Sequence, residues 1–301
     1  MICIGIIGAG RMGARHVKTV LALAASQDLR LAGVYDPDPA AALRTHADLG
    51  QLIGACDALI VSSPNEHHHV QALRCLHHGR HVLVEKPMTL SAAHARELCE
   101  EARRRGCVLS VGHSEVFNPA WQALRRFITW DCIYGVLSFE RFSPLPSSNT
   151  NPIDDLLVHD FALALDLQDD IAIRAANWRG RDHVLLSGGF SGCGARESLI
   201  LFEGGFCHPE PRRMVTIHSA NRSWTVNSLF EVDLLRKTLT ETRKSPVRGT
   251  EKIPHPVPPT DPLQEQLRAF VHCIRDRREG TAELGHLAVA LADQAKQYGR
   301  P

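Results

Sequence analysis

Short β-branched runs alternate with amphipathic, alanine- and leucine-rich segments through the first third of the chain. Such runs predict buried strands, and the segments between them predict helices. The strands predicted in this way are Ile2–Ile7, Leu31–Tyr35, Ala58–Val61, His81–Val84 and Val108–Val111. Because strands and helices alternate, we expect an α/β fold with a doubly wound parallel sheet that is covered by helices on both faces.

Helix boundaries are also marked in this region. The segment Ser91–Arg105 carries Leu98 and Ala102 on one helical face. Ser91 is a residue type that caps helix N-termini, and Gly106 stands where a left-handed residue closes the C-terminus. Local chemistry therefore favours a helix between two of the predicted strands.

The pattern changes after about residue 115. One helical segment, Ile153–Leu167, interrupts a series of strand candidates. These candidates are Gly135–Phe142, Ala172–Trp178, Ser198–Phe202, Met214–His218 and Trp224–Asn227. Strands that follow one another without intervening helices predict a largely antiparallel sheet, so we expect a second domain of the α+β class.

The end of the chain is expected to return to helix. A proline-rich connector, Ile253–Pro259, precedes two helices predicted to begin near Asp261-Pro262 and Thr281. A length of 301 residues fits two domains of roughly 100–200 residues each. We therefore predict an N-terminal domain over residues 1–118 and a C-terminal domain over residues 119–301 that includes both helices.

Composition and charge narrow the classes of function. Lys plus Arg (34) nearly balance Asp plus Glu (33), which argues against a nucleic-acid partner. No stretch approaches the ~18 apolar residues of a membrane span and no signal region follows Met1, so we expect a soluble, cytoplasmic protein. The nine cysteines are scattered and never form a C-x-x-C pair, which favours reduced thiols over disulfides or structural zinc.

A glycine motif follows the first predicted strand. Gly8-Ala9-Gly10-Arg11-Met12-Gly13 matches G-x-G-x-x-G between a strand and a helix. The first glycine permits a tight turn, the second lets the backbone approach a pyrophosphate, and the third lets helix and strand pack closely. The helix N-terminus supplies N–H donors to the phosphates. By itself the motif also fits a glycine-rich turn in some other α/β protein.

Asp36 strengthens the interpretation as a dinucleotide site. It ends the second predicted strand, roughly 20 residues after the last motif glycine, where an acid can accept both ribose hydroxyls. A carboxylate also repels a 2′-phosphate, so NAD is favoured over NADP, although Arg11 and Arg44 leave NADP open. The alternative is that Asp36 only begins a turn before a helix.

Two further groups of residues could carry proton transfer. Glu85-Lys86-Pro87 follows the strand His81–Val84, and ligands of parallel sheets sit at the carboxyl ends of strands. Asp155 and His159 are spaced i, i+4, so a carboxylate and an imidazole share one helical face and can form a tuned general base. A strand-end surface lysine and a solvated Asp–His contact are the alternatives.

A cluster of histidines invites a metal hypothesis. Its members are His67, His68, His69, His77, His78 and His81. Adjacent residues of one helix point in different directions, and Gly79 is expected to interrupt the helix before His81. We therefore expect no metal site there.

This ordered set of motifs resembles the Gfo/Idh/MocA family of oxidoreductases, the glucose–fructose oxidoreductase and inositol dehydrogenase type. The resemblance covers nearly the whole chain and is strongest through about residue 125. It rests on GIIGAGRMG, Asp36, Ser63-Pro64-Asn65 with His68, HVLVEKP, VGHSEVFNPA, and the helix with Asp155 and His159, which looks like the family's D-x-x-x-H motif.

The resemblance implies a Rossmann domain and a role for each matching position. The glycines would hold the pyrophosphate, and Asp36 would bind the adenosine ribose. Ser63, Asn65 and His68, which follow the third predicted strand, would border the nicotinamide half. The implied cofactor-binding positions are Gly8, Gly10, Arg11, Met12, Gly13, Asp36, Ser63, Asn65, His68 and Glu85. Lys86 would contact the reacting hydroxyl, next to a Pro87 that is often cis in this family. His159 would exchange the hydroxyl proton, and Asp155 would hold the substrate or the imidazole.

The chain departs from the family pattern in three places. Ala162 stands where many relatives have Asp, and Val116 where a close subgroup has Arg. The second domain looks shorter than usual around Gly188–Gly194 and Gly204–Pro211. A trimmed sheet would leave an open substrate site.

The function expected from these observations is hydride transfer between NAD, or NADP, and a secondary alcohol or ketone of a sugar, nucleotide sugar or cyclitol. A dinucleotide-binding sensor without turnover is one alternative, and a reductase of a non-sugar substrate is another. The lysine, aspartate and histidine argue against a sensor, which needs only the glycines. Relatives of this kind commonly form homodimers or homotetramers, and we expect the same here.

Overall fold

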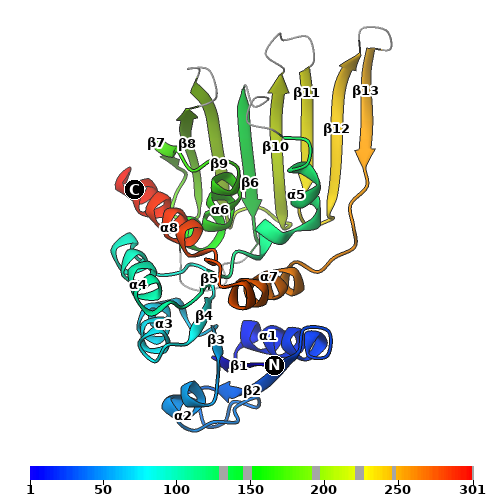
Figure 1. The fold of residues 1–301 in the computed structure, drawn as a ribbon. Helices are drawn as coiled ribbons and strands as arrows, with labels where there is room; N and C mark the ends of the chain where they lie inside the picture. Colours follow the sequence, from blue (N-terminus) through cyan, green and yellow to red (C-terminus); the bar gives the residue numbers. More distant parts are fainter. Residues whose placement is uncertain (129–134, 145–150, 192–196, 221–226, 246–248, 300–301) are drawn as a thin grey trace. The chain divides into compact units, whose positions relative to one another are not determined.

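The computed structural model describes residues 1–128, 135–144, 151–191, 197–220, 227–245 and 249–299 (Figure 1). The contacts divide the chain into two compact units. The first unit comprises Met1–Ser114 and Leu263–Val289, and the second comprises Glu115–Pro262 and Ala290–Pro301.

The first unit is built on a five-stranded, all-parallel sheet with the order β2-β1-β3-β4-β5. The strands are β1 (Ile2–Ile7), β2 (Leu29–Tyr35), β3 (Ala58–Val61), β4 (His81–Val84) and β5 (Leu109–Val111). The predicted parallel sheet is confirmed, and three of the five strands have the predicted bounds. The predicted helix is α4 (Ala92–Arg105), with Ser91 accepting a hydrogen bond from the amide of His94 and Gly106 left-handed.

Helices cover both faces of this sheet. On one face, α1 (Arg11–Leu23) and α7 (Pro262–Asp276) share a core with β1, in which Val20, Phe270 and Ile6 are buried. On the other face, α2 (Leu49–Gly54), α3 (His68–His77) and α4 share a second core with Val289 of α8 (Ala282–Gln297). A parallel sheet is stable only when both faces are buried, and α1 and α7 together complete the first face.

The segment after residue 262 therefore belongs largely to the first unit, whereas the predicted division places it wholly in the C-terminal domain. The physical reason is the exposed edge of β5. Gln266 donates from Nε2 to the carbonyl of Val111 at 2.9 Å, and Thr281 Oγ1 accepts from the Val111 amide at 2.9 Å. These two side chains form hydrogen bonds with the backbone at the edge of β5, where a sixth strand would otherwise pair.

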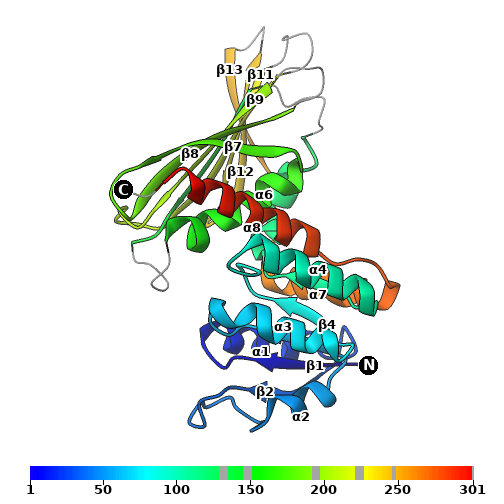
Figure 2. The ribbon, with the colours of Figure 1, turned by 90° about the vertical axis from the view of Figure 1, so that its left-hand side faces the viewer.

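The second unit carries an eight-stranded sheet with the order β13-β12-β11-β10-β6-β9-β8-β7. The strands are β6 (Val136–Phe142), β7 (Ile171–Trp178), β8 (His183–Ser191), β9 (Glu197–Gly205), β10 (Arg212–Ala220), β11 (Asn227–Asp233), β12 (Thr238–Ser245) and β13 (Gly249–His255). All pairs are antiparallel except β6 with β9, so the predicted, largely antiparallel sheet is confirmed. Helix α6 (Val158–Leu167) lies beside this sheet (Figure 2). It packs there through Phe161, whose ring meets that of Phe202 edge-on.

Some predictions for this unit need correction. The connector Ile253–Pro259 is partly strand, because β13 extends to His255 and Pro254 pairs with Thr240. Proline fits there because β13 is an edge strand, where a missing donor leaves no broken ladder. Of the predicted strand Trp224–Asn227, residues 224–226 lie outside the described residues, and β11 begins at Asn227.

The glycine-rich stretches of the second unit lie partly within strands. Gly188 lies within β8, and Gly204 and Gly205 lie within β9. A Cβ atom on Gly188 would come within 2.2 Å of the Ala172 carbonyl oxygen, and one on Gly204 within 2.6 Å of Leu157. These glycines therefore allow close packing inside long strands. Residues 192–196 lie outside the described residues.

Among the described residues, no helix is both long and apolar enough to cross a membrane. The cysteines Cys3, Cys56, Cys75, Cys99, Cys107, Cys207 and Cys273 are free thiols, and Cys132 and Cys193 lie outside the described residues.

The close approach of Gly280 to β5 gives a test of how the C-terminal segment packs. A Cβ atom on Gly280 would lie 2.3 Å from the Leu109 carbonyl oxygen, which is backbone and cannot rotate away. We predict that Gly280→Ala destabilises the protein by about 1–3 kcal/mol and lowers Tm by several degrees, as overpacking does. Gly54→Ala is the matched control, because a Cβ atom there meets no atom within 4 Å. Calorimetry that shows equal Tm values for both variants would contradict this packing.

Candidate functional site

The glycine motif forms a tight turn between β1 and α1. Gly8 has φ +98°, a left-handed conformation that favours glycine. A Cβ atom on Gly13 would lie 2.0 Å from the Gly8 carbonyl oxygen, so only glycine lets α1 start this close to β1. The first and third glycines thus have the structural roles that the motif predicts.

The remaining glycine leaves space for a ligand. A Cβ atom on Gly10 would meet no atom within 4 Å, and Gly10 stands at the N-cap of α1, where it offers no side chain to cap the first amides. Those amides include Arg11 and Met12, and the helix dipole adds partial positive charge. Open space beside uncapped helix amides fits a dinucleotide pyrophosphate.

Asp36 lies at the carboxyl end of β2 and contacts the glycine turn directly. Its Oδ2 atom accepts a hydrogen bond from the Ala9 amide at 2.7 Å, and Oδ1 accepts from Asp38 at 2.9 Å. Each carboxylate oxygen can accept a further hydrogen bond, so these contacts orient Asp36 and leave acceptor capacity. Arg44, one of two arginines that could serve a 2′-phosphate, instead donates to the carbonyls of His46 and Ala47.

The residues after β3 are held by their own hydrogen bonds. Ser63 Oγ donates to Gln71 at 2.6 Å, and Asn65 begins the short 3₁₀ helix η1 (Asn65–His67). His68 is buried, with Nδ1 at 2.8 Å from the Pro87 carbonyl and Nε2 at 2.9 Å from the Ser63 carbonyl. Burial lowers the pKa of His68, although both carbonyls oppose this shift. His68 therefore bridges two loops, and its contact with the nicotinamide stays a prediction.

Glu85-Lys86-Pro87 continues from the carboxyl end of β4. The Lys86–Pro87 peptide bond is cis, as the resemblance implies. Lys86 is half-buried, whereas Glu85 is only 7% exposed and its Oε1 atom lies 2.8 Å from Nε2 of His16 in α1. The structure thus uses the Glu85 carboxylate inside the protein, while its predicted contact with the cofactor stays a prediction.

Near Lys86, the electrostatics favour a charged carboxylate at Glu85 and a neutral imidazole at His113. Burial raises the pKa of Glu85, but the hydrogen bond with His16 and the interactions with His16 and Lys86 outweigh it, so this pKa lies below its usual value. His113, buried after β5, has its pKa lowered to about 4, first by burial and then by the Lys86 cation. His113 is accordingly neutral near pH 7.

In the second unit, Asp155 and His159 lie on one helix, but its first turn is not α-helical. Residues Ile153–Leu157 form the π-helical turn η4, and α6 follows directly. Asp155 is 7% exposed in the π turn, and His159 is half-buried in the first turn of α6. π turns are rare and often mark functional sites.

Hydrogen bonds and ion pairs fix the start of this helix. Asn151 Oδ1 accepts from the amides of Ile153 and Asp154 at 2.9 and 3.0 Å. Lys296 Nζ contacts Asp154 Oδ1 at 3.1 Å. The polypeptide that carries Asp155 is thus held from two sides within the second unit.

A buried ion network, which the sequence did not reveal, holds the residue next to His159. Arg141 in β6 is 1% exposed and binds Asp160 through Nε at 2.9 Å and Nη2 at 2.7 Å. Glu115 accepts from Arg213 at 2.7 Å and from Arg141 at 3.4 Å, and from Asn118 at 2.9 Å. Burial raises the pKa of Glu115, yet the two arginines outweigh it and hold this pKa below its usual value.

The two departures from the family pattern are core positions. Ala162 has no exposed surface, and Val116 is 6% exposed. Both side chains therefore pack within the second unit, so the missing Asp and Arg are replaced by buried apolar groups.

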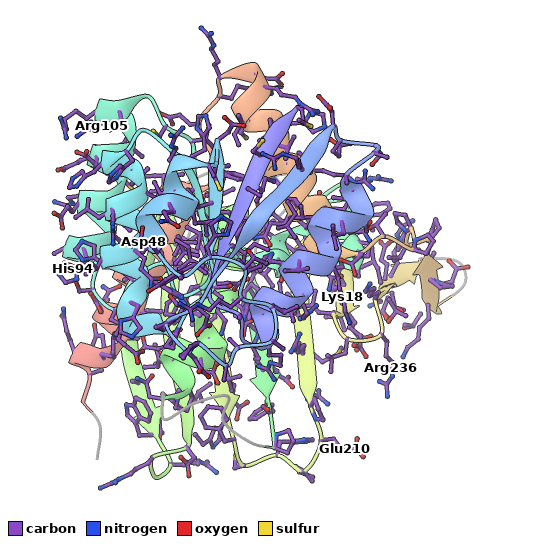
Figure 3. All side chains as sticks on the ribbon, turned by 90° about the horizontal axis from the view of Figure 1, so that it is seen from below. Lys18, Asp48, His94, Arg105, Glu210 and Arg236 are labelled. Carbon is purple, nitrogen blue, oxygen red and sulfur yellow. The ribbon has the colours of Figure 1, made fainter. Side chains whose placement is uncertain are left out.

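The histidine cluster is spread over separate contacts. His69 stacks on His94 with ring centroids 4.0 Å apart, and His69 Nε2 lies 2.8 Å from Glu97. His94 and Arg105 lie on the same helix, α4 (Figure 3). In the described part of the chain, no three His, Cys, Asp or Glu side chains are arranged to hold a metal ion.

The first part of the chain matches a known family. Residues 2–113 match the family model described as an oxidoreductase family with an NAD-binding Rossmann fold. UDP-N-acetylglucosamine 3-dehydrogenase from Acidithiobacillus ferrooxidans is 32% identical over 171 residues, which are 54% of this chain and 52% of that protein. Inositol 2-dehydrogenase 2 from Saccharopolyspora erythraea is 35% identical over 42% of this chain and 40% of that protein. The chain thus aligns with about half the length, or less, of these curated relatives.

The fold extends the likeness over the full chain. A solved structure of the Acidithiobacillus ferrooxidans UDP-N-acetylglucosamine 3-dehydrogenase superposes with a TM-score of 0.83 and 23% identity, covering 99% of this chain and 97% of that one. That match shows the fold, a Rossmann-type sheet with a second, largely antiparallel sheet. The family match of residues 2–113 is to the Gfo/Idh/MocA oxidoreductase family, the one that the motifs of the sequence resemble.

Proposed function

We propose that the chain catalyses reversible hydride transfer between a nicotinamide dinucleotide and a secondary alcohol or ketone of a sugar, nucleotide sugar or cyclitol. The observation that carries this proposal is the carboxyl edge of the parallel sheet, where the glycine turn, Asp36 and Lys86 follow β1, β2 and β4. The names of two relatives support the substrate class, since one acts on a nucleotide sugar and one on inositol. The cytoplasmic location and the homodimeric or homotetrameric state stay predictions.

The dinucleotide supplies the hydride acceptor or donor, and the first unit would bind it. The amides at the start of α1 would hold the pyrophosphate next to Gly10, and Asp36 would accept the adenosine ribose hydroxyls. Asp36 also disfavours a 2′-phosphate, and Arg44 already serves two carbonyls. NAD is therefore the proposed cofactor over NADP.

Proton transfer is the task that this chain's own side chains would perform. When a hydride leaves an alcohol carbon, the hydroxyl must lose its proton to give a carbonyl. We assign His159 as the base, because an imidazole titrates near neutral pH. Asp155 would orient His159 or the substrate, and Lys86 would hydrogen-bond the reacting oxygen. A sensor without turnover needs none of these three groups.

Asp36 predicts the cofactor preference. In calorimetric titrations, NAD(H) should bind more tightly than NADP(H), because a 2′-phosphate would meet a carboxylate. Asp36→Ser should shift the ratio of the two Kd values toward NADP(H) by roughly tenfold or more, since the repulsive element is lost. Asp38→Ser, two residues further along the exposed turn, should leave that ratio unchanged. Equal or tighter binding of NADP(H) to the wild type would contradict the assignment of NAD.

The role proposed for Lys86 predicts that its replacement lowers turnover and leaves cofactor binding intact. Lys86→Met should lower kcat about 100-fold or more while dinucleotide affinity stays within a few-fold, because the lost group acts on the reacting oxygen. The assay follows nicotinamide absorbance with a panel of polyols and nucleotide sugars. Lys18→Met, at an exposed position of α1, is the control. Turnover near the wild-type rate would show that Lys86 does not act on the reacting oxygen, and a wild type that binds NADH but turns over no substrate would favour the sensor.

His159 predicts the pH dependence. Oxidation should rise with pH through a single ionisation, since only a neutral imidazole accepts the proton. His159→Asn should abolish that ionisation and lower kcat at least ~100-fold with NAD binding retained. His272→Asn, exposed on α7, controls for the loss of a histidine. A pH–rate profile that stays unchanged in His159→Asn would assign the proton to another group.

A further inference from the structure

We propose that His16 is a positioning residue that acts through Glu85: it fixes the backbone at Lys86 and couples the start of α1 to that lysine. The coupling rests on the function proposed above for α1 and Lys86. The geometry that supports it lies entirely within the first unit and involves neither substrate nor cofactor.

His16 faces inward from the helix that begins at the glycine turn. It follows Gly13 by three residues, about one helical turn, and is 1% exposed. Lys18, two residues further on, is exposed (Figure 3). The Nε2 atom of His16 lies 2.8 Å from Oε1 of Glu85, a residue 69 positions away in the sequence. One side chain thus connects α1 to the end of β4.

Glu85 transmits this contact to Lys86. Its second carboxylate oxygen, Oε2, accepts a hydrogen bond from the Lys86 amide at 3.2 Å. The Glu85 amide donates to the Val61 carbonyl at 2.8 Å, so the backbone here remains part of the sheet. The carboxylate therefore bridges α1 and the Lys86 backbone with one hydrogen bond on each oxygen.

The space around the Glu85 carboxylate leaves it little freedom. A Cβ atom on Gly112 would lie 2.8 Å from Oε2 and 2.9 Å from the Glu85 Cα atom. Only a glycine at this point of the chain leaves room for the carboxylate between β4 and the end of β5. Because the Glu85 side chain has little room to move on its own, a displacement of α1 should also displace the Lys86 backbone.

Both members of the His16–Glu85 contact are buried. Nδ1 of His16 is buried and has no hydrogen-bond partner among the described residues. The contact between His16 Nε2 and Glu85 Oε1 is therefore the one side-chain hydrogen bond that the structure gives His16 among the described residues, with the imidazole N–H donating to the carboxylate. His16 thus holds one oxygen of the Glu85 carboxylate, whose negative charge lies beside Lys86.

The other end of the same segment is held independently. His68 contacts the carbonyl of Pro87 at 2.8 Å, so Lys86-Pro87 is held at its amide by Glu85 and at its carbonyl by His68. Because His68 remains in place when His16 is replaced, loss of His16 should loosen the Lys86 amide locally and leave the segment folded.

The test is backbone amide exchange at Lys86, measured by NMR on the full chain without substrate or cofactor. His16→Leu removes the donor, and exchange of the Lys86 amide should become at least about tenfold faster relative to the amides within β4. His16→Gln places an amide donor near the position of Nε2 and should restore exchange to within a few-fold of wild type. Lys18→Leu is the control on the exposed face of the same helix.

A second variant keeps the test decisive if His16→Leu does not fold because Glu85 is left as an unpaired buried charge. The double variant His16→Leu/Glu85→Gln removes that charge and still lacks the connection to α1, so faster exchange at Lys86 is expected again. Unchanged exchange in the folded variant, or an equal increase throughout β4, would overturn the proposal, because the pair would then serve stability alone.

The coupling between α1 and Lys86 is tested by a separate measurement. Addition of NAD⁺ to the wild type should slow Lys86 amide exchange several-fold, and in His16→Leu this effect should be lost although NAD⁺ still binds. In turnover assays His16→Leu should lower kcat about tenfold or more with KM for NAD⁺ within a few-fold, and His16→Gln should recover most of it. An equal NAD⁺ effect in both proteins would overturn the coupling. If Lys86→Met turns over normally, the proposed function fails, while the exchange measurements still judge the positioning role.

Discussion

The requirement that a parallel sheet be buried on both faces governs the first unit. Five parallel strands cannot leave a face in water, yet α1 alone covers only part of one face. The chain meets this requirement by returning after β13 to place α7 beside α1, with Leu267 and Phe270 in the same core as Ile4. With both faces covered, the carboxyl edge of the sheet is the place where polar groups can meet a ligand, and the glycine turn, Asp36 and Lys86 all lie there.

Buried charges impose a second requirement, and each unit meets it with pairs. In the second unit, Arg141 is bound by Asp160 and Glu115, and Glu115 also binds Arg213, so two cations balance two carboxylates. Such networks contribute little net stability compared with apolar packing, but removing one partner is costly. Their value is geometric: the Arg141–Asp160 pair fixes the backbone directly after His159.

Local signals in the sequence allowed much of the fold to be predicted. The glycine turn, the Ser91 cap and the β-branched runs depend on neighbours within a few residues, and the structure has them as expected. Strands β8, β12 and β13 were missed, and so was β11 beyond Asn227. Thr238–Ser245 is almost entirely polar, β13 contains a proline, and Gly188-Gly189 interrupts the apolar positions of β8. The place of α7 and the pairing of His16 with Glu85 depend on contacts between distant parts of the chain, which a single sequence does not specify.

The two acidic residues at strand ends show how burial separates roles that look alike in the sequence. Asp36 follows β2 and Glu85 follows β4, and both were predicted to bind the cofactor. Asp36 is half-buried and accepts hydrogen bonds from the amides of Ala9 and Asp38, which leaves acceptor capacity for the proposed ribose contact. Glu85 is 7% exposed, and both its oxygens are engaged within the protein. A carboxylate at a strand end therefore predicts a polar site, while its exposure separates one with acceptor capacity left for a proposed ligand from one that holds a neighbouring residue.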